Sequence, residues 1–146
     1  MGPQYTEGMA SEEAIYYHLS KCNNDFIPPL EAKVNIQEYS TKIFQKSVTF
    51  EAWDGNIMIG LVAAYFNDPA RQTGYITNVS IIGSYKGKGI ASNLLNKCVD
   101  YARKNSFRNI CLEVARSNHY AINLYMKFGF HVYENKDFLV LMKLDI

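Results

Sequence analysis

The segment that most constrains the fold of this chain lies in its middle, where a strand pattern runs through a glycine-rich turn into a helix pattern. Residues 75–82 read YITNVSII, residues 85–91 read YKGKGIA, and an apolar stripe with helical spacing follows over residues 88–105. A second short apolar stretch, Ile110–Val114, comes next. A strand, a helix and a strand in this order predict a crossover in which the two strands lie side by side and parallel.

The segments around this unit predict a single mixed α/β domain over residues 1–146, without repeats or linkers. Ser11 is a plausible N-cap for the first helix, and the Asn and Pro pairs of residues 23–30 predict a loop. The first ten residues are rich in turn formers, and we expect them to be partly disordered. We expect further helices over residues 35–46 and 117–128, and further strands over residues 48–53, 57–66, 130–133 and 138–143.

The composition excludes several classes of protein. Fifteen Lys and Arg residues balance fourteen Asp and Glu residues, so we expect no nucleic acid as a partner. The three cysteines lack metal-ligand spacing, which predicts no metal. The chain shows neither a signal peptide nor an apolar run long enough for a membrane span. We therefore expect a cytoplasmic protein without a membrane partner, either a monomer or a homodimer.

The glycines of the central turn indicate an anion site. Glycine inside a helix costs about 1 kcal/mol relative to alanine, so Gly87 and Gly89 need a reason to stand where a helix begins. The start of a helix presents unpaired amides that bind phosphate, and Lys86 and Lys88 would add positive charge. The motif is neither a phosphate-binding Walker loop nor a full G-x-G-x-x-G. The alternative is a plain turn with solvated lysines.

Two sequence blocks together resemble the GNAT superfamily of acetyl-CoA-dependent N-acetyltransferases. The family signature Arg/Gln-x-x-Gly-x-Gly/Ala follows a strand and opens a helix, and residues 86–91 read KGKGIA, with Lys86 at the first position. The block LEVARSNHYAINLYMKFGF, residues 112–130, is similar to the later strand and helix of the family. The resemblance covers residues 75–133 well. It implies a central, mixed and mostly antiparallel sheet with a splayed parallel strand pair, flanked by helices.

The resemblance also implies roles for individual residues. The CoA pyrophosphate would lie on the amides of the glycine turn, and the pantetheine arm would fit between the splayed strands. Asn118 would bond the arm or a water, and Tyr125, two turns later on the same helix face, would protonate the departing CoA thiolate. Asn118 and Tyr125 are thus the catalytic residues that the resemblance implies. The cofactor-binding residues are then Val79, Ile81, Lys86, Gly87, Lys88, Gly89, Ile90, Ala91, Asn118 and Tyr125. As alternatives, Asn118 is only a helix-start residue and Tyr125 only a core aromatic.

The implied reaction is direct attack of an amine on the acetyl thioester of acetyl-CoA. Many members of the family carry Glu just before the position of Asn78, but here that residue is Thr77, which cannot act as a base near neutral pH. A water relay through Thr77 and backbone carbonyls is as plausible as a carboxylate or histidine. Conceivable helpers are Glu51, Asp68, Glu113 and His119.

The expected acceptor is a primary amine of a small molecule, with an amino sugar as the first candidate. We expect its pocket to be lined by residues 23–30, by the tip Tyr65–Arg71 and by the loop before Phe138, which are aromatic and carry few charges. A protein N-terminus or lysine, a hydroxyl acceptor and a longer acyl donor stay open. So does a different class of protein, a non-catalytic acyl-CoA sensor on the same fold.

Overall fold

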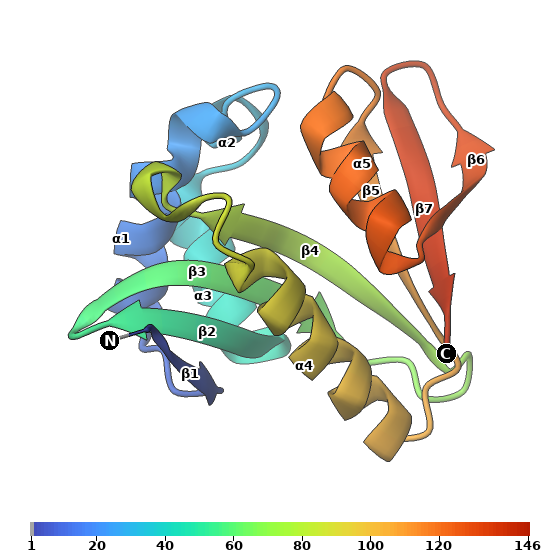
Figure 1. The fold of residues 1–146 in the computed structure, drawn as a ribbon, viewed down its shortest axis with the longest axis horizontal. Coiled ribbons are helices and arrows are strands. Elements are labelled where there is room, and N and C mark those ends of the chain that lie inside the picture. Colours follow the sequence, from blue (N-terminus) through green and yellow to red (C-terminus); the bar gives the residue numbers. More distant parts are fainter. Residues whose placement is uncertain (1) are drawn as a thin grey trace.

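The computed structural model describes residues 2–146, which form a seven-stranded sheet with helices on both faces (Figure 1). The strands are β1 (Gln4–Glu7), β2 (Val48–Asp54), β3 (Ile57–Tyr65), β4 (Thr73–Ile81), β5 (Asn109–Ala115), β6 (His131–Asn135) and β7 (Leu139–Asp145). The α-helices are α1 (Glu12–Cys22), α2 (Leu30–Lys33), α3 (Ile36–Lys46), α4 (Ile90–Lys104) and α5 (His119–Phe128).

The sheet has the order β1-β2-β3-β4-β5-β7-β6, and β4 with β5 is its parallel pair. Their pairing starts at Thr73 with Asn109 and ends at Ile76 with Leu112, although β4 continues to Ile81. Beyond Ile76 the two strands diverge, and Figure 1 shows the widening gap between β4 and the β5–β7–β6 half. The predicted fold class, a mixed and mostly antiparallel sheet with a splayed parallel pair, is confirmed.

The core lies on both faces of the strands that carry this gap. Strand β3 is buried along nearly its whole length, because Val62 and Ala64 pack in the cluster that includes α4 while Leu61 and Ala63 pack in the cluster that includes α1 and α3. A strand buried on both faces shows a continuous apolar run instead of an alternating one. Among the described residues no helix is long and apolar enough to cross a membrane.

The expectation of partial disorder in residues 1–10 does not hold for the part of this segment that the structure describes. Residues 4–7 form β1 along the edge of β2, whereas Met1 lies outside the described residues. The fully buried carboxylate of Glu51 holds the segment, because it accepts hydrogen bonds from the Thr6 hydroxyl and from the amides of Met9 and Ala10. A buried carboxylate needs such donors, and here they come from the segment with turn-forming composition.

The helix boundaries differ from the prediction in ways that matter for the site. Helix α4 begins at Ile90, two residues later than expected, because Gly89 has the left-handed conformation with φ 80°. Helix α5 begins at His119, with Asn118 as its N-cap. The predicted loop over residues 23–30 contains a 3₁₀ turn at Asn23–Asp25 and leads directly into the short helix α2.

Candidate active site

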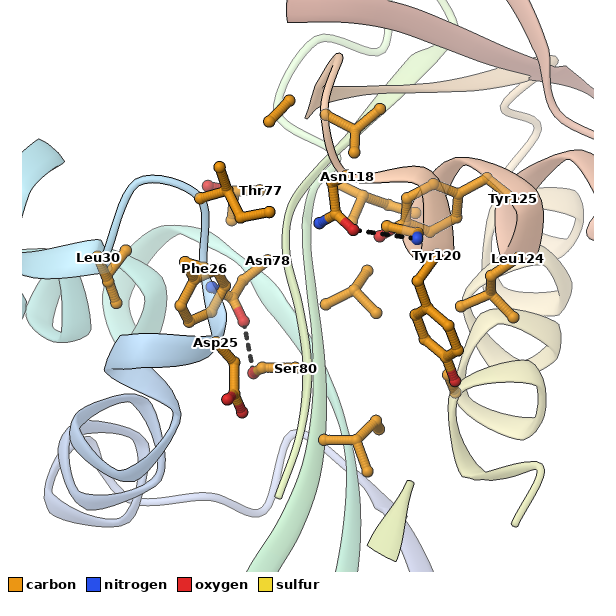
Figure 2. A pocket seen from close by; sticks show the side chains of 18 of the residues that line it. Asp25, Phe26, Leu30, Thr77, Asn78, Ser80, Asn118, Tyr120, Leu124 and Tyr125 are labelled. Atoms are coloured by element: carbon orange, nitrogen blue, oxygen red, sulfur yellow. Dashed lines mark hydrogen bonds between the residues drawn. The ribbon is translucent and has the colours of Figure 1, made fainter. Parts of the chain in front are cut away.

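A cavity of about 570 Å³ opens where β4 and β5 part. Figure 2 shows Asn118, Tyr120, Leu124 and Tyr125 of the α5 segment on one side of the strands, with Asp25, Phe26 and Leu30 on the other. One cavity therefore has one wall from the α5 segment and another from the segment between α1 and α2. Of the ten predicted cofactor-binding residues, nine line it: Val79, Ile81, Lys86, Gly87, Gly89, Ile90, Ala91, Asn118 and Tyr125.

The glycine turn has the properties that an anion site requires. Gly87 and Gly89 have φ values of 78° and 80°, and a Cβ on either would meet nothing within 4 Å, so their backbone faces open space. The first helical bond of α4 runs from the Asn93 amide to the Gly89 carbonyl, and no side chain caps the helix. The amides that precede this bond are available to a phosphate.

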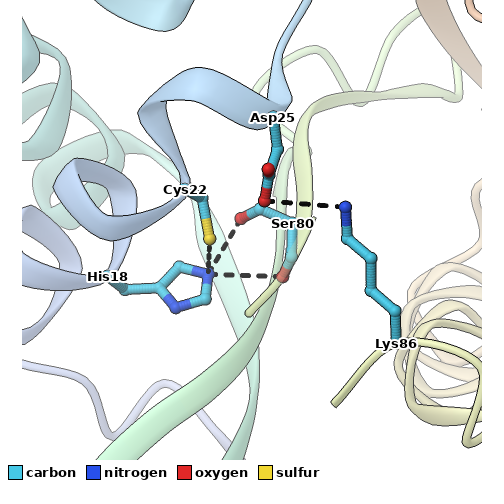
Figure 3. Close-up of polar contacts among 5 residues, drawn as sticks. All are labelled: His18, Cys22, Asp25, Ser80 and Lys86. Atoms are coloured by element: carbon cyan, nitrogen blue, oxygen red, sulfur yellow. Dashed lines mark hydrogen bonds and ion pairs between the residues drawn. The ribbon is translucent and has the colours of Figure 1, made fainter. Parts of the chain in front are cut away.

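The two lysines of the turn differ in their placement. Lys88, the tenth predicted residue, does not line the cavity; its ammonium lies 5.6 Å from the centre of the Tyr85 ring. Lys86 does line it, and its ammonium lies 3.5 Å from the Asp25 carboxylate (Figure 3). The turn is therefore linked to the segment that follows α1.

The free edge of β4 faces the same cavity. Val79 and Ile81 pair with β3 through Val62 and Gly60, while the pairing of β4 with β5 has already ended at Ile76. Peptide groups on that side can pair with an extended chain that enters as an additional strand. The edge and the glycine turn are the two places where the sequence resemblance predicts the pantetheine arm and the pyrophosphate of CoA.

The α5 wall carries the two predicted catalytic residues. Asn118 accepts a hydrogen bond from the Ala121 amide at 3.2 Å, so it is a helix cap as well as a residue of the cavity lining. Tyr125 is only 7% exposed and packs edge to face against Phe130, with ring centres 5.7 Å apart. Burial raises the pKa of Tyr125, so its hydroxyl stays protonated at neutral pH.

The opposite wall contains phenols around the strand divergence. The Tyr39 hydroxyl of α3 donates to the Thr77 carbonyl at 2.8 Å and lies at the same distance from the Thr77 hydroxyl. Burial raises the pKa of Tyr39 to about 12. The Tyr75 hydroxyl of β4 donates to a carboxylate oxygen of Glu113 on β5, at 3.3 Å. All four side chains belong to residues that line the cavity.

A buried hydrogen-bond network between α1 and β4 stabilises this wall. Ring nitrogen Nε2 of His18 lies 2.9 Å from the Ser80 hydroxyl, as Figure 3 shows, and Ser80 in turn donates to the Asn78 side-chain oxygen at 2.7 Å. The other His18 nitrogen lies 3.1 Å from the Met58 carbonyl. Burial lowers the pKa of His18, which keeps the ring neutral. The network fixes the Asn78 side chain beside the cavity.

The other candidate helpers lie elsewhere. Glu51 binds the N-terminal segment, Asp68 pairs with Arg71 on the surface, and His119 is exposed outside the cavity lining. Of the four, Glu113 alone lines the cavity. Among the described residues no group of His, Cys, Asp or Glu could hold a metal ion.

The segments predicted to line the acceptor pocket line this cavity only in part. The segment of residues 23–30 does line the cavity, through Asp25, Phe26, Ile27 and Leu30. The tip Tyr65–Arg71 and the loop before Phe138 lie outside the cavity lining, and Phe138 points into solvent with 85% exposure. The expectation that these two segments line the same cavity is wrong.

Sequence reasoning did not find Tyr39, Tyr75 or the His18 network. Tyr75 had a usable signal, because in a strand it shares a face with Thr77. Tyr39 and His18 had none, since both are brought to β4 from helices by tertiary packing alone.

Comparisons with known proteins agree with this geometry. The chain is 33% identical over 87 residues to N-alpha-acetyltransferase 50 of Danio rerio, an alignment that covers 58% of this chain and 52% of the relative. Over 54 residues it is 39% identical to the putative [ribosomal protein bS18]-alanine N-acetyltransferase of Bacillus subtilis, with 37% of this chain and 36% of the relative covered. The chain thus spans about a third to a half of the length of these relatives.

One solved structure superposes on nearly the whole chain. The PaiA N-acetyltransferase of Thermoplasma acidophilum, in complex with coenzyme A, superposes with a TM-score of 0.79 at 15% identity, over 98% of this chain and 99% of that one. The sequence model of the acetyltransferase (GNAT) family matches residues 13–130. With the glycine turn and the splayed strands at the expected places in the fold, the chain belongs to the acetyltransferase (GNAT) family.

Proposed function

We propose that this protein transfers the acetyl group of acetyl-CoA to a primary amine of a small molecule, in a complex that holds both substrates. The observation that carries the proposal is that one cavity joins the glycine turn and the free edge of β4 to a second wall with polar and aromatic groups. A CoA-binding sensor would need only the first of these two walls.

The cofactor half of the cavity would bind CoA through backbone groups. The amides at the start of α4 and the charge of Lys86 would hold the pyrophosphate, and the edge of β4 around Val79 would align the arm. Bound acetyl-CoA supplies the acetyl group as an activated thioester. The protonated Tyr125 would supply a proton to the sulfur as the amine displaces it.

The acceptor half suits an amino sugar. Phe26 and Tyr75 offer aromatic faces for the apolar side of a sugar ring, and Tyr39, Asn78 and Asp25 offer hydrogen-bond partners for hydroxyl groups. The amine would reach the thioester through the divergence between β4 and β5, so the two substrates would approach from opposite faces of the sheet.

A second acceptor class is the α-amino group of a peptide. Two observations favour it: the relatives include proteins named N-alpha-acetyltransferase, and the apolar side chains of Ile27, Leu30 and Val34 line part of the acceptor wall. An apolar side chain beside the α-amino group of a peptide could occupy that part of the wall.

The test is steady-state release of free CoA from acetyl-CoA with three sets of acceptors: amino sugars, including nucleotide-linked ones, small alkyl amines, and short peptides with free N-termini. Turnover with amino sugars and not with peptides supports the proposal. Turnover with peptides alone would show that the acceptor is the amino group of a peptide, and the proposed acetyl transfer would stand. A protein that binds acetyl-CoA in calorimetry but acetylates nothing in the panel would be a sensor.

A further inference from the structure

We propose that His18 of α1 is a positioning residue for the acceptor wall. Whether its ring carries one proton or two decides, through the Ser80 hydroxyl, which end of the Asn78 amide faces the cavity. The effect on the acceptor rests on the proposed function, whereas the orientation of the amide in the free protein does not.

The three side chains form a line from α1 to the cavity. Asn78 and Ser80 lie two residues apart on β4, so they point to the same face of the sheet. His18, Asn78 and Ser80 are all buried, which obliges their polar atoms to bond to one another. Figure 3 shows the His18 ring directed at Ser80, and Figure 2 shows the Ser80 hydroxyl joined to the Asn78 amide. The proton positions in these bonds are therefore coupled.

Three oxygen atoms surround the His18 ring, and two of them can only accept a hydrogen bond. Nδ1 lies 3.1 Å from the Met58 carbonyl, and Nε2 lies 3.2 Å from the Ser80 carbonyl and 2.9 Å from the Ser80 hydroxyl. A charged imidazole has two N–H groups, whereas a neutral one has an N–H on one nitrogen and a lone pair on the other. The two charge states therefore need different hydrogen-bond arrangements.

With a charged ring, the arrangement is complete as the structure has it. Nδ1 donates to the Met58 carbonyl, Nε2 donates to Ser80, and the Ser80 hydroxyl donates its hydrogen to the Asn78 side-chain oxygen at 2.7 Å. The NH2 end of the Asn78 amide then points away from Ser80.

A neutral ring reverses this order. The Met58 carbonyl has no hydrogen to give, so both ring nitrogens have a partner only when the ring proton is on Nδ1 and Nε2 accepts from the Ser80 hydroxyl. The Ser80 oxygen then needs a donor, and the NH2 group of Asn78 supplies one after a half-turn of the amide. Because the amide oxygen and nitrogen are alike in size, the turn leaves the other heavy atoms in place. In this state the Asn78 oxygen points away from Ser80.

The end of the amide that points away from Ser80 faces the acceptor wall. Burial raises the pKa of Tyr39 to about 12, and hydrogen bonds from Thr77 and then Asn78 are smaller effects that oppose the rise. Asn78 thus lies beside the Tyr39 phenol, and both residues line the cavity. An acceptor in the cavity meets the amide oxygen when His18 is neutral and the NH2 group when His18 is charged.

The titratable groups around the ring leave its charge to burial. The charge of Lys21 on α1 lowers the His18 pKa less than burial does. The Cys22 thiol lies 3.8 Å from Nε2, and burial followed by the Asp25 charge raises the pKa of this thiol to about 11, so it stays neutral. Asp25 itself is paired with Lys86, and from α3 the phenol described above borders Asn78. The ring is thus neutral at neutral pH and becomes charged only as the pH falls below its ordinary pKa of 6.5.

The neutral state suits an attacking amine. The oxygen of the Asn78 amide can accept a hydrogen bond from an amine N–H. The NH2 group could bind only the lone pair that the amine needs for its attack. Acidification would therefore weaken the binding of the acceptor by turning the Asn78 amide, in addition to protonating the amine itself.

Nuclear magnetic resonance of nitrogen-15-labelled protein tests the amide directly and needs no acceptor. The variant His119→Gln/His131→Gln removes the two exposed histidines and leaves His18 as the only ring to observe. While the protein remains folded, we expect a ring proton on Nδ1 at pH 7.5, two ring protons at low pH, and Asn78 NH2 signals that shift with the same midpoint. A neutral ring protonated on Nε2, or Asn78 signals that ignore the ring, would overturn the proposal.

Ser80→Ala cuts the link between the ring and the amide and leaves both in place. The acceptor KM of wild type and variant is measured from pH 5.5 to pH 8 with the best amine of the panel. The ionisation of the amine is the same in both assays, so it cancels in the ratio of the two KM values. On acidification we expect the wild-type KM to rise about three- to tenfold relative to that of the variant, as for one lost hydrogen bond, with a constant ratio of kcat values.

Two further variants separate this link from a structural role. His18→Gln cannot take up a proton, so its KM should show the same pH dependence as Ser80→Ala, and it serves where Ser80→Ala does not fold. Ser40→Ala is the matched control, because it removes another buried serine hydroxyl, which bonds within α3 to the Ile36 carbonyl at 2.8 Å. It should keep the wild-type profile.

A KM ratio that does not change with pH would overturn the link to the acceptor, and so would the same profile in wild type and His18→Gln. The absence of turnover on any amine would refute the proposed function and the effect on the acceptor together. The resonance titration would then still decide whether His18 turns the amide.

Discussion

The Lys86 ammonium lies 3.5 Å from the Asp25 carboxylate, and this contact joins the glycine turn of the cofactor half to the segment that leads into the acceptor wall. Both side chains are close to half exposed, so the pair is weak, of the order of 0–1 kcal/mol. An incoming pyrophosphate would compete with Asp25 for the same ammonium.

From that competition we expect Asp25→Asn to bind acetyl-CoA more tightly, by up to about fivefold, because Lys86 is released for the phosphates. The gain should shrink as salt is added. Calorimetric titration at low and high ionic strength measures both effects. Asp68→Asn, which breaks the remote pair with Arg71 at 3.3 Å, is the matched control and should leave the affinity unchanged.

Replacing Gly89 by valine should weaken acetyl-CoA binding at least tenfold, about 1.4 kcal/mol. A β-branched residue is strained at φ 80°, and its side chain would stand in the open space above the α4 amides. Calorimetry on the folded variant, checked by circular dichroism, gives the answer. Gly83→Val is the control, because a Cβ there meets nothing and φ is not positive. Unchanged affinity in Gly89→Val would place the pyrophosphate elsewhere.

Tyr125→Phe tests the proposed proton donor on α5. The ring and its edge-to-face contact with Phe130 remain, and only the hydroxyl is lost. Turnover should fall by about 10²–10⁴-fold while acetyl-CoA affinity changes little. Tyr120→Phe, an exposed tyrosine of the same wall, should have a much smaller effect. Lower thermal stability with normal turnover would instead make Tyr125 a structural residue.

His18 should make the stability of the protein depend on pH. Burial lowers its pKa below the ordinary 6.5, so the folded state resists protonation that the unfolded chain accepts. The stability contributed by neutral His18 is present above about pH 6.5 and is lost as the pH falls below it, by at most about 1.4 kcal/mol per unit. Urea unfolding at pH 7.5 and 5.5 measures the loss. His18→Gln should show a smaller difference between the two pH values, and an equal difference would assign the effect to other groups.

The sequence predicted those parts of the fold that local patterns determine. Helix periodicity, caps such as Ser11 and the alternation of strand residues are encoded within short windows, and the glycine turn marked the cofactor half. Strand β1 had no such signal, because its place depends on the buried carboxylate of Glu51, more than forty residues away in the sequence.

The part of the cavity that we propose for the acceptor was predicted less well, because it too depends on contacts between residues far apart in the sequence. The contact between Tyr75 and Glu113 joins residues 38 positions apart, and that between Tyr39 and Thr77 spans the same separation. Neither pair follows from periodicity, because each depends on the register of β4 against β5 or on the docking of α3. The glycine turn, by contrast, lies within six consecutive residues, 86–91, so its proposed role in binding pyrophosphate could be predicted from a short window.

The early end of the β4–β5 pairing also affects the free energy of unfolding. Four residue pairs, from Thr73 with Asn109 to Ile76 with Leu112, form the backbone seam between β1–β4 and β5–β7–β6. A pantetheine arm bound along β4 would complete the seam, so its binding free energy would add to the free energy of unfolding. The resistance of the protein to heat and proteolysis would then follow the acetyl-CoA concentration around it, and its abundance would report the acetyl-CoA supply.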